Sequence, residues 1–142
     1  MIANLVGLAL VAMQTTPPES AWTWTLYDDD ARVALANEVP DTPNLRFTLE
    51  CDPGSGVARV TLYGTTVEPG MARVTAGDAS AVTESTSERS GLKLALRTEH
   101  PVFAAFAADG RLSIAVGEQR RAVEVPRPHL AKLRRFTELC SG

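Results

Sequence analysis

The sequence predicts a mainly β protein: an antiparallel β-sandwich or half-open barrel with one short helix and a C-terminal helix. Two observations support this class. Apolar and polar residues alternate over several short segments separated by Gly- or Pro-containing turns, and the apolar spacing becomes helical near the C-terminus. The chain has 142 residues, of which 44% are hydrophobic and 22% charged, the length and composition of one globular domain. We therefore expect a single β-rich domain over residues 21–142.

The first two strands are expected on either side of an acidic turn. Large apolar residues alternate with Thr from Trp22 to Leu26, aspartates at 28–30 interrupt the pattern, and alternation resumes at Val33. The three aspartates are consecutive and lack the alternate spacing and central Gly of an EF-hand, so a hairpin turn is favoured over a calcium loop. Trp22 and Trp24 share one face, which favours packing in the core over a sugar-binding platform.

The segment 45–51 has the clearest strand pattern in the chain. Its apolar residues alternate with polar ones, which places the Cys51 side chain on the core face. The sequence DPGSG at 52–56 predicts a tight turn, because Pro fixes φ and Gly permits positive φ. The same alternation predicts further strands near residues 58–62, 72–76, 92–96, 112–116 and 123–125.

Residues 78–90 differ from their surroundings. They are rich in Ser, Thr and Glu and have few apolar side chains. We expect a loop here, and a loop of this length is either mobile or functional.

Two helices are expected in the last third of the chain. Near residues 100–109 the alanines favour helix, Pro101 suits the first turn, and Gly110 can end it, with Thr98 as the expected N-cap. Near residues 128–140 apolar side chains recur at helical spacing. These are Leu130, Leu133, Phe136 and Cys140.

The chain contains only two cysteines, Cys51 and Cys140. Each falls on the core side of its own element. A metal pair or a reactive thiol would need a neighbouring His, Cys or Lys at close spacing, which neither cysteine has. In an oxidising compartment the pattern predicts one structural disulfide between them.

The N-terminus predicts export. Residues 2–13 are apolar or small except for Asn4, the length of a signal-peptide core and too short to span a bilayer. We expect a signal peptide over 1–14, cleaved between 12 and 16, and a periplasmic or secreted protein without a transmembrane span. The alternative is a buried first element, since no Lys or Arg precedes the apolar run.

Charge is distributed unevenly along the chain. Residues 1–110 carry a formal net charge of −7, whereas residues 111–142 carry +4. One interpretation is a face that contacts an anionic partner, and the other is a solvated, Arg-rich helix surface. The candidate face consists of Arg127, Lys132, Arg134 and Arg135. Nucleic acid is not an expected partner, because the whole chain is acidic and lacks a basic platform with aromatic residues.

The sequence shows no catalytic or cofactor-binding signature. The chain has two histidines, His100 and His129, but no G-x-S-x-G motif that would supply a nucleophilic serine for them to activate. It also contains no phosphate loop, dinucleotide fingerprint or zinc-ligand spacing. His100 is interpreted as a residue at a helix N-terminus and His129 as a first-turn surface residue. We predict no cofactor, no metal and no assigned catalytic residue, and favour a non-enzymatic protein.

The strand LRFTLEC at 45–51 and the closing segment LAKLRRFTELC at 130–140 resemble small uncharacterised periplasmic proteins of Gram-negative bacteria. In those proteins a mid-chain strand cysteine pairs with one near the end of the C-terminal helix. The resemblance implies an envelope location and a β-sandwich-like fold, and it transfers no active residue.

Three function hypotheses follow. The first is a non-enzymatic periplasmic binding or interaction module of unknown ligand, acting through sheet edges or the 78–90 loop. The second is a small hydrolase, or an inhibitor of an envelope enzyme, which would gather His100, Asp109 and the 28–30 turn in one cleft. The third is an envelope-associated factor that docks through its basic C-terminal helix.

Overall fold

The structure is a computed structural model that describes residues 16–65, 68–88 and 91–142, so the leader expected over 1–14 lies outside the described residues. In this part of the chain one sheet contains nine strands. They are β1 (Thr23–Asp28), β2 (Val33–Glu38), β3 (Leu45–Cys51), β4 (Val57–Tyr63), β5 (Met71–Ala76), β6 (Ala79–Glu88), β7 (Gly91–Arg97), β8 (Arg111–Val116) and β9 (Gln119–Glu124). The helical elements are two short 3₁₀ turns, η1 (Glu19–Ala21) and η2 (Arg127–His129), and two α-helices, α1 (Pro101–Asp109) and α2 (Leu130–Cys140).

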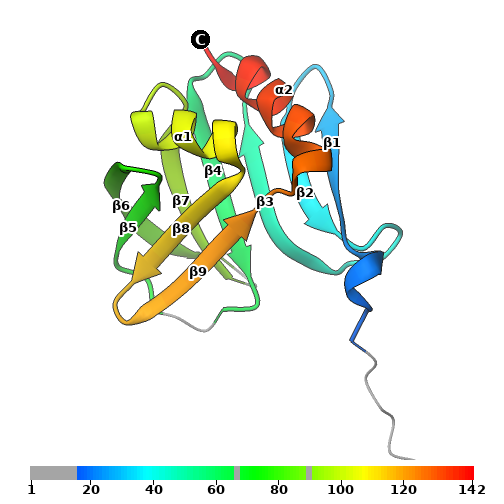
Figure 1. The fold of residues 1–142 in the computed structure, drawn as a ribbon, viewed down its shortest axis with the longest axis horizontal. Helices are drawn as coiled ribbons and strands as arrows, with labels where there is room; N and C mark the ends of the chain where they lie inside the picture. Colours follow the sequence, from blue (N-terminus) through cyan, green and yellow to red (C-terminus); the bar gives the residue numbers. More distant parts are fainter. Residues whose placement is uncertain (1–15, 66–67, 89–90) are drawn as a thin grey trace, which may run out of the picture.

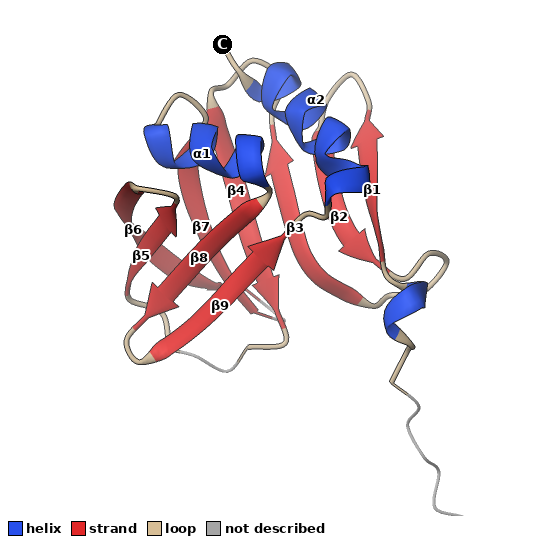
Figure 2. Cartoon of the chain, in the orientation of Figure 1, coloured by secondary structure: helices blue, strands red, loops and turns tan. Residues whose placement is uncertain are grey.

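The strands form a curled antiparallel sheet in the order β1-β2-β3-β4-β7-β6-β5-β8-β9 (Figure 1). The curl is that of a half-open barrel, which confirms the mainly β class with one short helix and a C-terminal helix. Both α-helices lie across the same end of the strands (Figure 2). The strand order makes β1 and β9 the two ends of the sheet.

None of the helices in the described part is long and apolar enough to cross a membrane.

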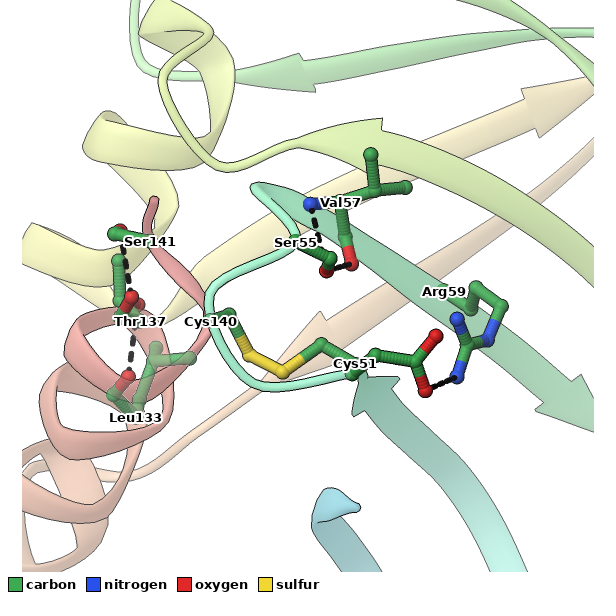
Figure 3. Close-up of a disulfide and its surroundings, with 9 residues drawn as sticks. Cys51, Ser55, Val57, Arg59, Leu133, Thr137, Cys140 and Ser141 are labelled. Carbon is green, nitrogen blue, oxygen red and sulfur yellow. Dashed lines mark hydrogen bonds and ion pairs between the residues drawn. A yellow bond between two sulfur atoms is a disulfide. The ribbon is translucent and has the colours of Figure 1, made fainter. Parts of the chain in front are cut away.

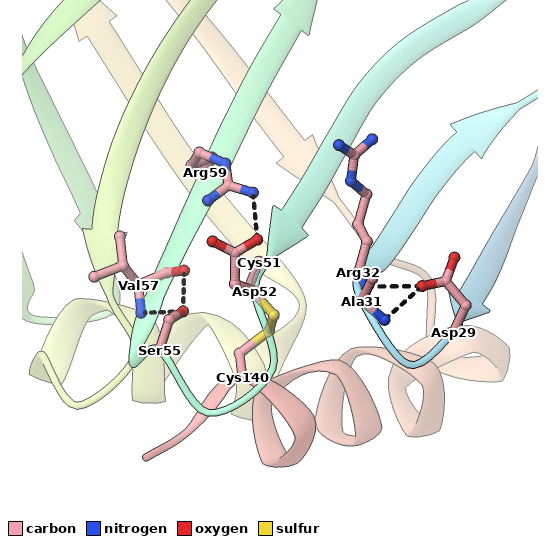
Figure 4. A network of polar contacts seen from close by, with 9 residues as sticks. All are labelled: Asp29, Ala31, Arg32, Cys51, Asp52, Ser55, Val57, Arg59 and Cys140. Carbon is pink, nitrogen blue, oxygen red and sulfur yellow. Dashed lines mark hydrogen bonds and ion pairs between the residues drawn. A yellow bond between two sulfur atoms is a disulfide. The ribbon is translucent and has the colours of Figure 1, made fainter.

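Polar contacts fix two of the expected turns (Figure 4). Between β1 and β2, Asp29 Oδ1 accepts hydrogen bonds from the backbone N–H groups of Ala31, at 2.9 Å, and Arg32, at 2.8 Å. These bonds lower the pKa of Asp29. Between β3 and β4, Arg59 reaches Asp52 at 3.7 Å. The aspartates at 28–30 thus belong to a hairpin turn, as predicted.

The prediction of a loop over 78–90 is wrong, because residues 79–88 form β6, the longest described strand of the sheet. Of its residues only Ser85 is buried, and the apolar residues packed against the core, Ala79 and Ala81, are small and partly exposed, so the strand gives a weak sequence signal. Hydrogen bonds hold it instead: its first half pairs with β5 and its second half with β7. At the change of partner, Ser85 Oγ donates to the Gly70 carbonyl at 2.6 Å and accepts from the Gly70 N–H at 2.9 Å. Ser85 therefore marks the point at which β6 changes its partner strand from β5 to β7.

The N-cap of helix α1 lies two residues after the expected one. The N-cap is His100, whose Nδ1 accepts from the backbone N–H of Val102 at 3.0 Å, and not Thr98, which is buried. The helix ends at Gly110, which has a left-handed φ of 77°. Phe103 and Phe106 are fully buried and meet edge to face, with ring centroids 5.8 Å apart. This contact fixes α1 on the core of the sheet.

Helix α2 is held to β3 by the predicted disulfide between Cys51 and Cys140 (Figure 3). The two Cα atoms are 5.8 Å apart and both residues are fully buried, as the alternation of β3 and the helical stripe predict. The turn after β3 also binds the end of the helix, since the N–H groups of Gly54 and Gly56 donate to the carbonyls of Leu139 and Cys140. These bonds satisfy carbonyls that a helix end leaves free.

Candidate functional site

A groove of about 610 Å³ lies between the inner face of the first three strands and the last strand. Its volume falls in the range of small ligand sites. Three separate segments of the chain build it. They contribute Glu19, Trp22, Thr23 and Trp24; Asn37, Arg46 and Phe47; and Ala122, Glu124, Pro126 and His129. A second hollow, of about 590 Å³, lies over β5 and β8 and is lined mainly by small side chains, so we consider the first groove as the site.

Trp24, Asn37 and Phe47 form the inner wall of the groove. They face one another across β1, β2 and β3, because Trp24 pairs with Asn37 and Asn37 pairs with Phe47. Residues directly opposite in an antiparallel sheet point to the same face. Asn37 Nδ2 donates to the Thr23 carbonyl at 3.2 Å, and its Oδ1 has no hydrogen-bond partner among the described residues. The wall therefore consists of two mostly buried aromatic rings on either side of one amide whose oxygen has no described partner.

At one end of the groove Arg46 orders the chain before β1. Its guanidinium donates to both carboxylate oxygens of Glu19, at 2.8 Å each, and lies 4.0 Å from the centroid of the Trp22 ring. The bidentate contact lowers the pKa of Glu19. The shielded indole Nε1 of Trp22 has no hydrogen-bond partner within the described chain. Both charges at this end are thus already neutralised.

At the other end Lys132 links α2 to β1. Its Nζ donates to the Trp24 carbonyl at 2.6 Å and to His129 Nδ1 at 3.1 Å. Partial burial, together with the Lys132 charge, lowers the pKa of His129. A neutral imidazole with Nδ1 as acceptor fits this geometry, so Lys132 carries the positive charge here.

The backbone of β9 presents unpaired groups to the groove. The N–H of Val125 donates to the Gly110 carbonyl at 2.7 Å, which marks a hydrogen-bonded pair at the end of the β8–β9 ladder. Such pairs alternate in an antiparallel ladder, so the N–H and C=O groups of Ala122 and Glu124 point away from β8. Both residues line the groove. The edge of β9 is therefore exposed where the groove runs along it.

The edge of β1 is different, because Lys132 covers part of it. Asp29 N–H donates to the Arg32 carbonyl, so the same alternation turns the Trp24 carbonyl away from β2. That carbonyl is the one that Lys132 binds. At the β1 end of the sheet one edge carbonyl is thus bound by a side chain, while at the β9 end no described residue binds the edge groups of Ala122 or Glu124.

Arg121 connects β9 to β3 and β4 through its side chain. Its guanidinium donates to the Tyr63 carbonyl at 3.3 Å and lies 5.2 Å from the centroid of the Phe47 ring. At this point β9 is therefore joined to these two strands by a side chain and not by a ladder. Phe47 also lines the groove, so the groove begins beside this contact.

The residues of the hydrolase hypothesis do not meet. His100 and Asp109 lie at opposite ends of α1, which nine residues make about 13 Å long. The aspartates at 28–30 belong to the turn between β1 and β2, and none of these residues lines the groove. Within the described ranges no three His, Cys, Asp or Glu side chains are grouped as a metal site would need.

The predicted basic face is only partly assembled. Arg127, Arg134 and Arg135 are exposed, and Arg135 pairs with Glu138 at 3.4 Å. Lys132 instead turns toward β1. Contact of this face with an anionic partner stays a prediction, which co-sedimentation with anionic vesicles at increasing salt would test.

Comparison with protein-family models, curated proteins and solved structures finds no match to this chain. The case for a function therefore rests on the geometry of the chain itself. Sequence reasoning noted Trp22 and Trp24 on one face but did not find the groove, because its walls come from opposite ends of the chain. The only local signal was the pair of aromatic residues beside a strand that starts the sheet.

Proposed function

We propose that this protein is a non-enzymatic binding module of the periplasm or the extracellular space, and that it binds its partner in the groove between β1–β3 and β9. One observation carries the proposal: a cavity of about 610 Å³ that is open along an unpaired strand edge. Aromatic rings with a few placed polar groups are the usual lining of a binding site.

The charges around the groove favour binding over catalysis. Glu19 is bound by Arg46, and Glu124 pairs with Arg111 at 3.1 Å. The contact with Arg46 lowers the pKa of Glu19, so this carboxylate acts as a fixed charge, which suits orientation of a ligand better than proton transfer. No observation on the described residues favours the alternative of a small hydrolase or an inhibitor.

The cellular location rests on two supports. A buried disulfide between distant parts of the chain is typical of oxidising compartments, and the apolar N-terminal segment is typical of a signal peptide. Together with the resemblance noted above, they support an envelope location.

Site-specific photo-crosslinking tests the proposal. A photoreactive phenylalanine analogue replaces Thr23 in the groove, or Val82, an exposed residue of β6, as the control position. We expect a discrete adduct in the exported fraction from Thr23 alone.

A blocking variant makes this result specific to the groove. Ala122→Trp narrows the groove from β9 and also reaches the second hollow, whereas Thr75→Trp narrows the second hollow alone. The adduct should disappear with the first substitution and persist with the second. Equal adducts from Thr23 and Val82, or an adduct that survives Ala122→Trp, would count against the groove as the binding site.

A further inference from the structure

We infer that the occupant of the groove is an extended, acidic polypeptide segment, which adds as a strand to the free edge of β9. The inference rests on the proposed function, because it names the partner of the same groove. It also makes a separate claim: main-chain hydrogen bonds from β9 hold the partner.

The first support is the pattern of unpaired backbone groups. Ala122 and Glu124 each turn one N–H and one C=O toward the groove, two residues apart along the strand. An extended peptide offers donors and acceptors at the same two-residue interval. Strand addition to an exposed sheet edge is a general way of binding peptides. The edge therefore selects a polypeptide over a compact small molecule.

The second support is the wall opposite this edge. Trp24, Asn37 and Phe47 point to one face of the first three strands, and all three line the groove. A strand paired with β9 would direct alternate side chains toward this wall. These side chains are only 3%, 7% and 8% exposed, so the wall offers the partner the exposed edges of two rings with the Asn37 amide between them. Main-chain pairing would thus give affinity and the wall would give selectivity.

The third support is charge. Glu19 and Glu124 are each paired with an arginine. By contrast, Lys132 and Arg121 donate to neutral acceptors, and Arg120 is exposed on β9 without an ion pair among the described residues. None of these three cations lines the groove itself, but Arg120 and Arg121 belong to β9, so a strand added to β9 would run past positive charge that no described carboxylate neutralises. A segment with Asp or Glu residues is complementary to it.

A second copy of this chain fits the groove less well. Pairing β9 of one copy with β9 of another would bring the first three strands of each copy in front of the edge that the other needs. The β1 edge is not an alternative, because Lys132 already binds its Trp24 carbonyl. A single unpaired segment of another protein meets neither obstacle.

Selection of peptides provides the probe. A displayed library of random peptides of roughly ten residues, long enough for one strand with its flanks, is panned against the oxidised full-length protein. We expect enrichment of peptides that contain Asp or Glu beside β-forming residues. Failure to enrich any peptide would overturn the inference.

Amide hydrogen exchange shows how a selected peptide binds. In the free protein the N–H groups of Ala122 and Glu124 should exchange fast, and those of Arg121 and Val123, which face β8, should exchange slowly. With saturating peptide the first pair should become slow as well. Binding that leaves the Ala122 and Glu124 amides fast would overturn strand addition while leaving the groove as a binding site.

A matched pair of variants tests the hydrogen bonds directly. Ala122→Pro removes an N–H that the β8–β9 ladder does not use, and proline is tolerated where a strand edge faces solvent. Ala122→Ser keeps the N–H. We expect the proline variant to bind a selected peptide about tenfold more weakly or worse, and the serine variant to bind like the wild type. Circular dichroism confirms that both fold.

Two further outcomes would contradict the inference. Equal affinity of Ala122→Pro and Ala122→Ser for the peptide would show that the edge N–H is not used. Protection of the Ala122 and Glu124 amides that rises with protein concentration, without peptide, would assign the edge to a second copy. Either result is independent of the crosslinking at Thr23, so the proposed function can stand when the strand model fails.

Discussion

Single side chains decide which parts of the groove are open. Lys132 binds one carbonyl of the β1 edge, Arg46 neutralises Glu19, and Arg121 connects β9 to β3 and β4. Each long cation thus uses its head group on a backbone carbonyl or a carboxylate. What remains open is the stretch of β9 that these side chains do not reach.

His129 makes the stability of this end of the groove dependent on pH. Its pKa is lowered by burial and by the Lys132 charge, so the unfolded chain, with an ordinary histidine, binds a proton at a pH where the native protein does not. Above about pH 6.5 both states are neutral and the residue has no effect. Below that value stability falls until the pH passes the native pKa.

The test compares the wild type with His129→Gln in urea unfolding at roughly pH 7.5 and pH 5.5, a window in which carboxylates with ordinary or lowered pKa stay ionised. We expect the wild type to lose more stability than the variant, by a fraction of a kcal/mol. An equal loss in both proteins would show that His129 titrates alike in the native and unfolded states.

At the scale of elements, Gly110 connects α1 to β8 and contacts Val125, the residue that follows β9. It ends the helix with φ of 77°, and a Cβ at this position would meet the Val125 carbonyl oxygen and approach Leu130 Cδ2 to 2.7 Å. Gly117, in the turn between β8 and β9, has φ of 58° but nothing within 4 Å of a Cβ. Comparing substitutions at the two glycines therefore separates the cost of backbone strain from the cost of a steric clash.

Gly117→Ala should cost about 1 kcal/mol, the penalty of a side chain in left-handed conformation. Gly110→Ala should cost about 3 kcal/mol or more, because it adds a clash with backbone that cannot move freely. Urea unfolding monitored by tryptophan fluorescence gives both values. Similar losses in the two variants would mean that the chain at Val125 yields to the added methyl group.

His100 offers a second test at this scale. As the N-cap of α1 its Nδ1 accepts the Val102 N–H, so His100→Ala should lower the free energy of unfolding by about 1 kcal/mol. His100→Asp should restore it, because a carboxylate is a good cap and favours the positive end of the helix dipole. If the aspartate variant is no more stable than the alanine variant, the capping role is wrong.

The elements that sequence patterns predicted are those with one buried face. The strand at 45–51 and the stripe from Leu130 to Cys140 gave Cys51 and Cys140 their inward directions before any coordinates were considered. Strand β6 was missed because its inward residues, such as Ala79 and Ala81, are small and only partly buried, so its alternation is weak in the sequence. The cap of α1 was misplaced at Thr98 because histidine is not among the preferred N-cap residues.

At the scale of the whole molecule, the groove follows from the order of the strands. The sheet ends at β1 and β9, so residues from opposite ends of the chain line one cavity. Alternation along a segment predicts that a strand exists but not which strand lies beside it. The pairings β4–β7 and β5–β8, which place β9 opposite β1, are long-range and leave no local signal. The site was for this reason beyond sequence reasoning, although the class of fold was not.

The disulfide acts at the same scale, because it closes a loop with a sequence separation of 89 residues that contains most of the sheet and α1. In the chain-entropy model, closing a loop of this size raises the free energy of the unfolded state by about 4.6 kcal/mol. A gain in stability of about 3–4 kcal/mol is realistic. The double variant Cys51→Ala/Cys140→Ala should therefore lose that amount of unfolding free energy relative to the oxidised wild type.

Three measurements complete this test. Mass mapping without reductant should give the Cys51–Cys140 cross-linked peptide, and urea unfolding should give the loss. Reductant should destabilise the wild type to the level of the double variant and leave the variant unchanged, since only the wild type has a bond to break. Detection of two free thiols in the exported protein would contradict the predicted disulfide. A double variant within about 1 kcal/mol of the oxidised wild type would show instead that the unfolded chain is already compact enough to gain little from closing the loop.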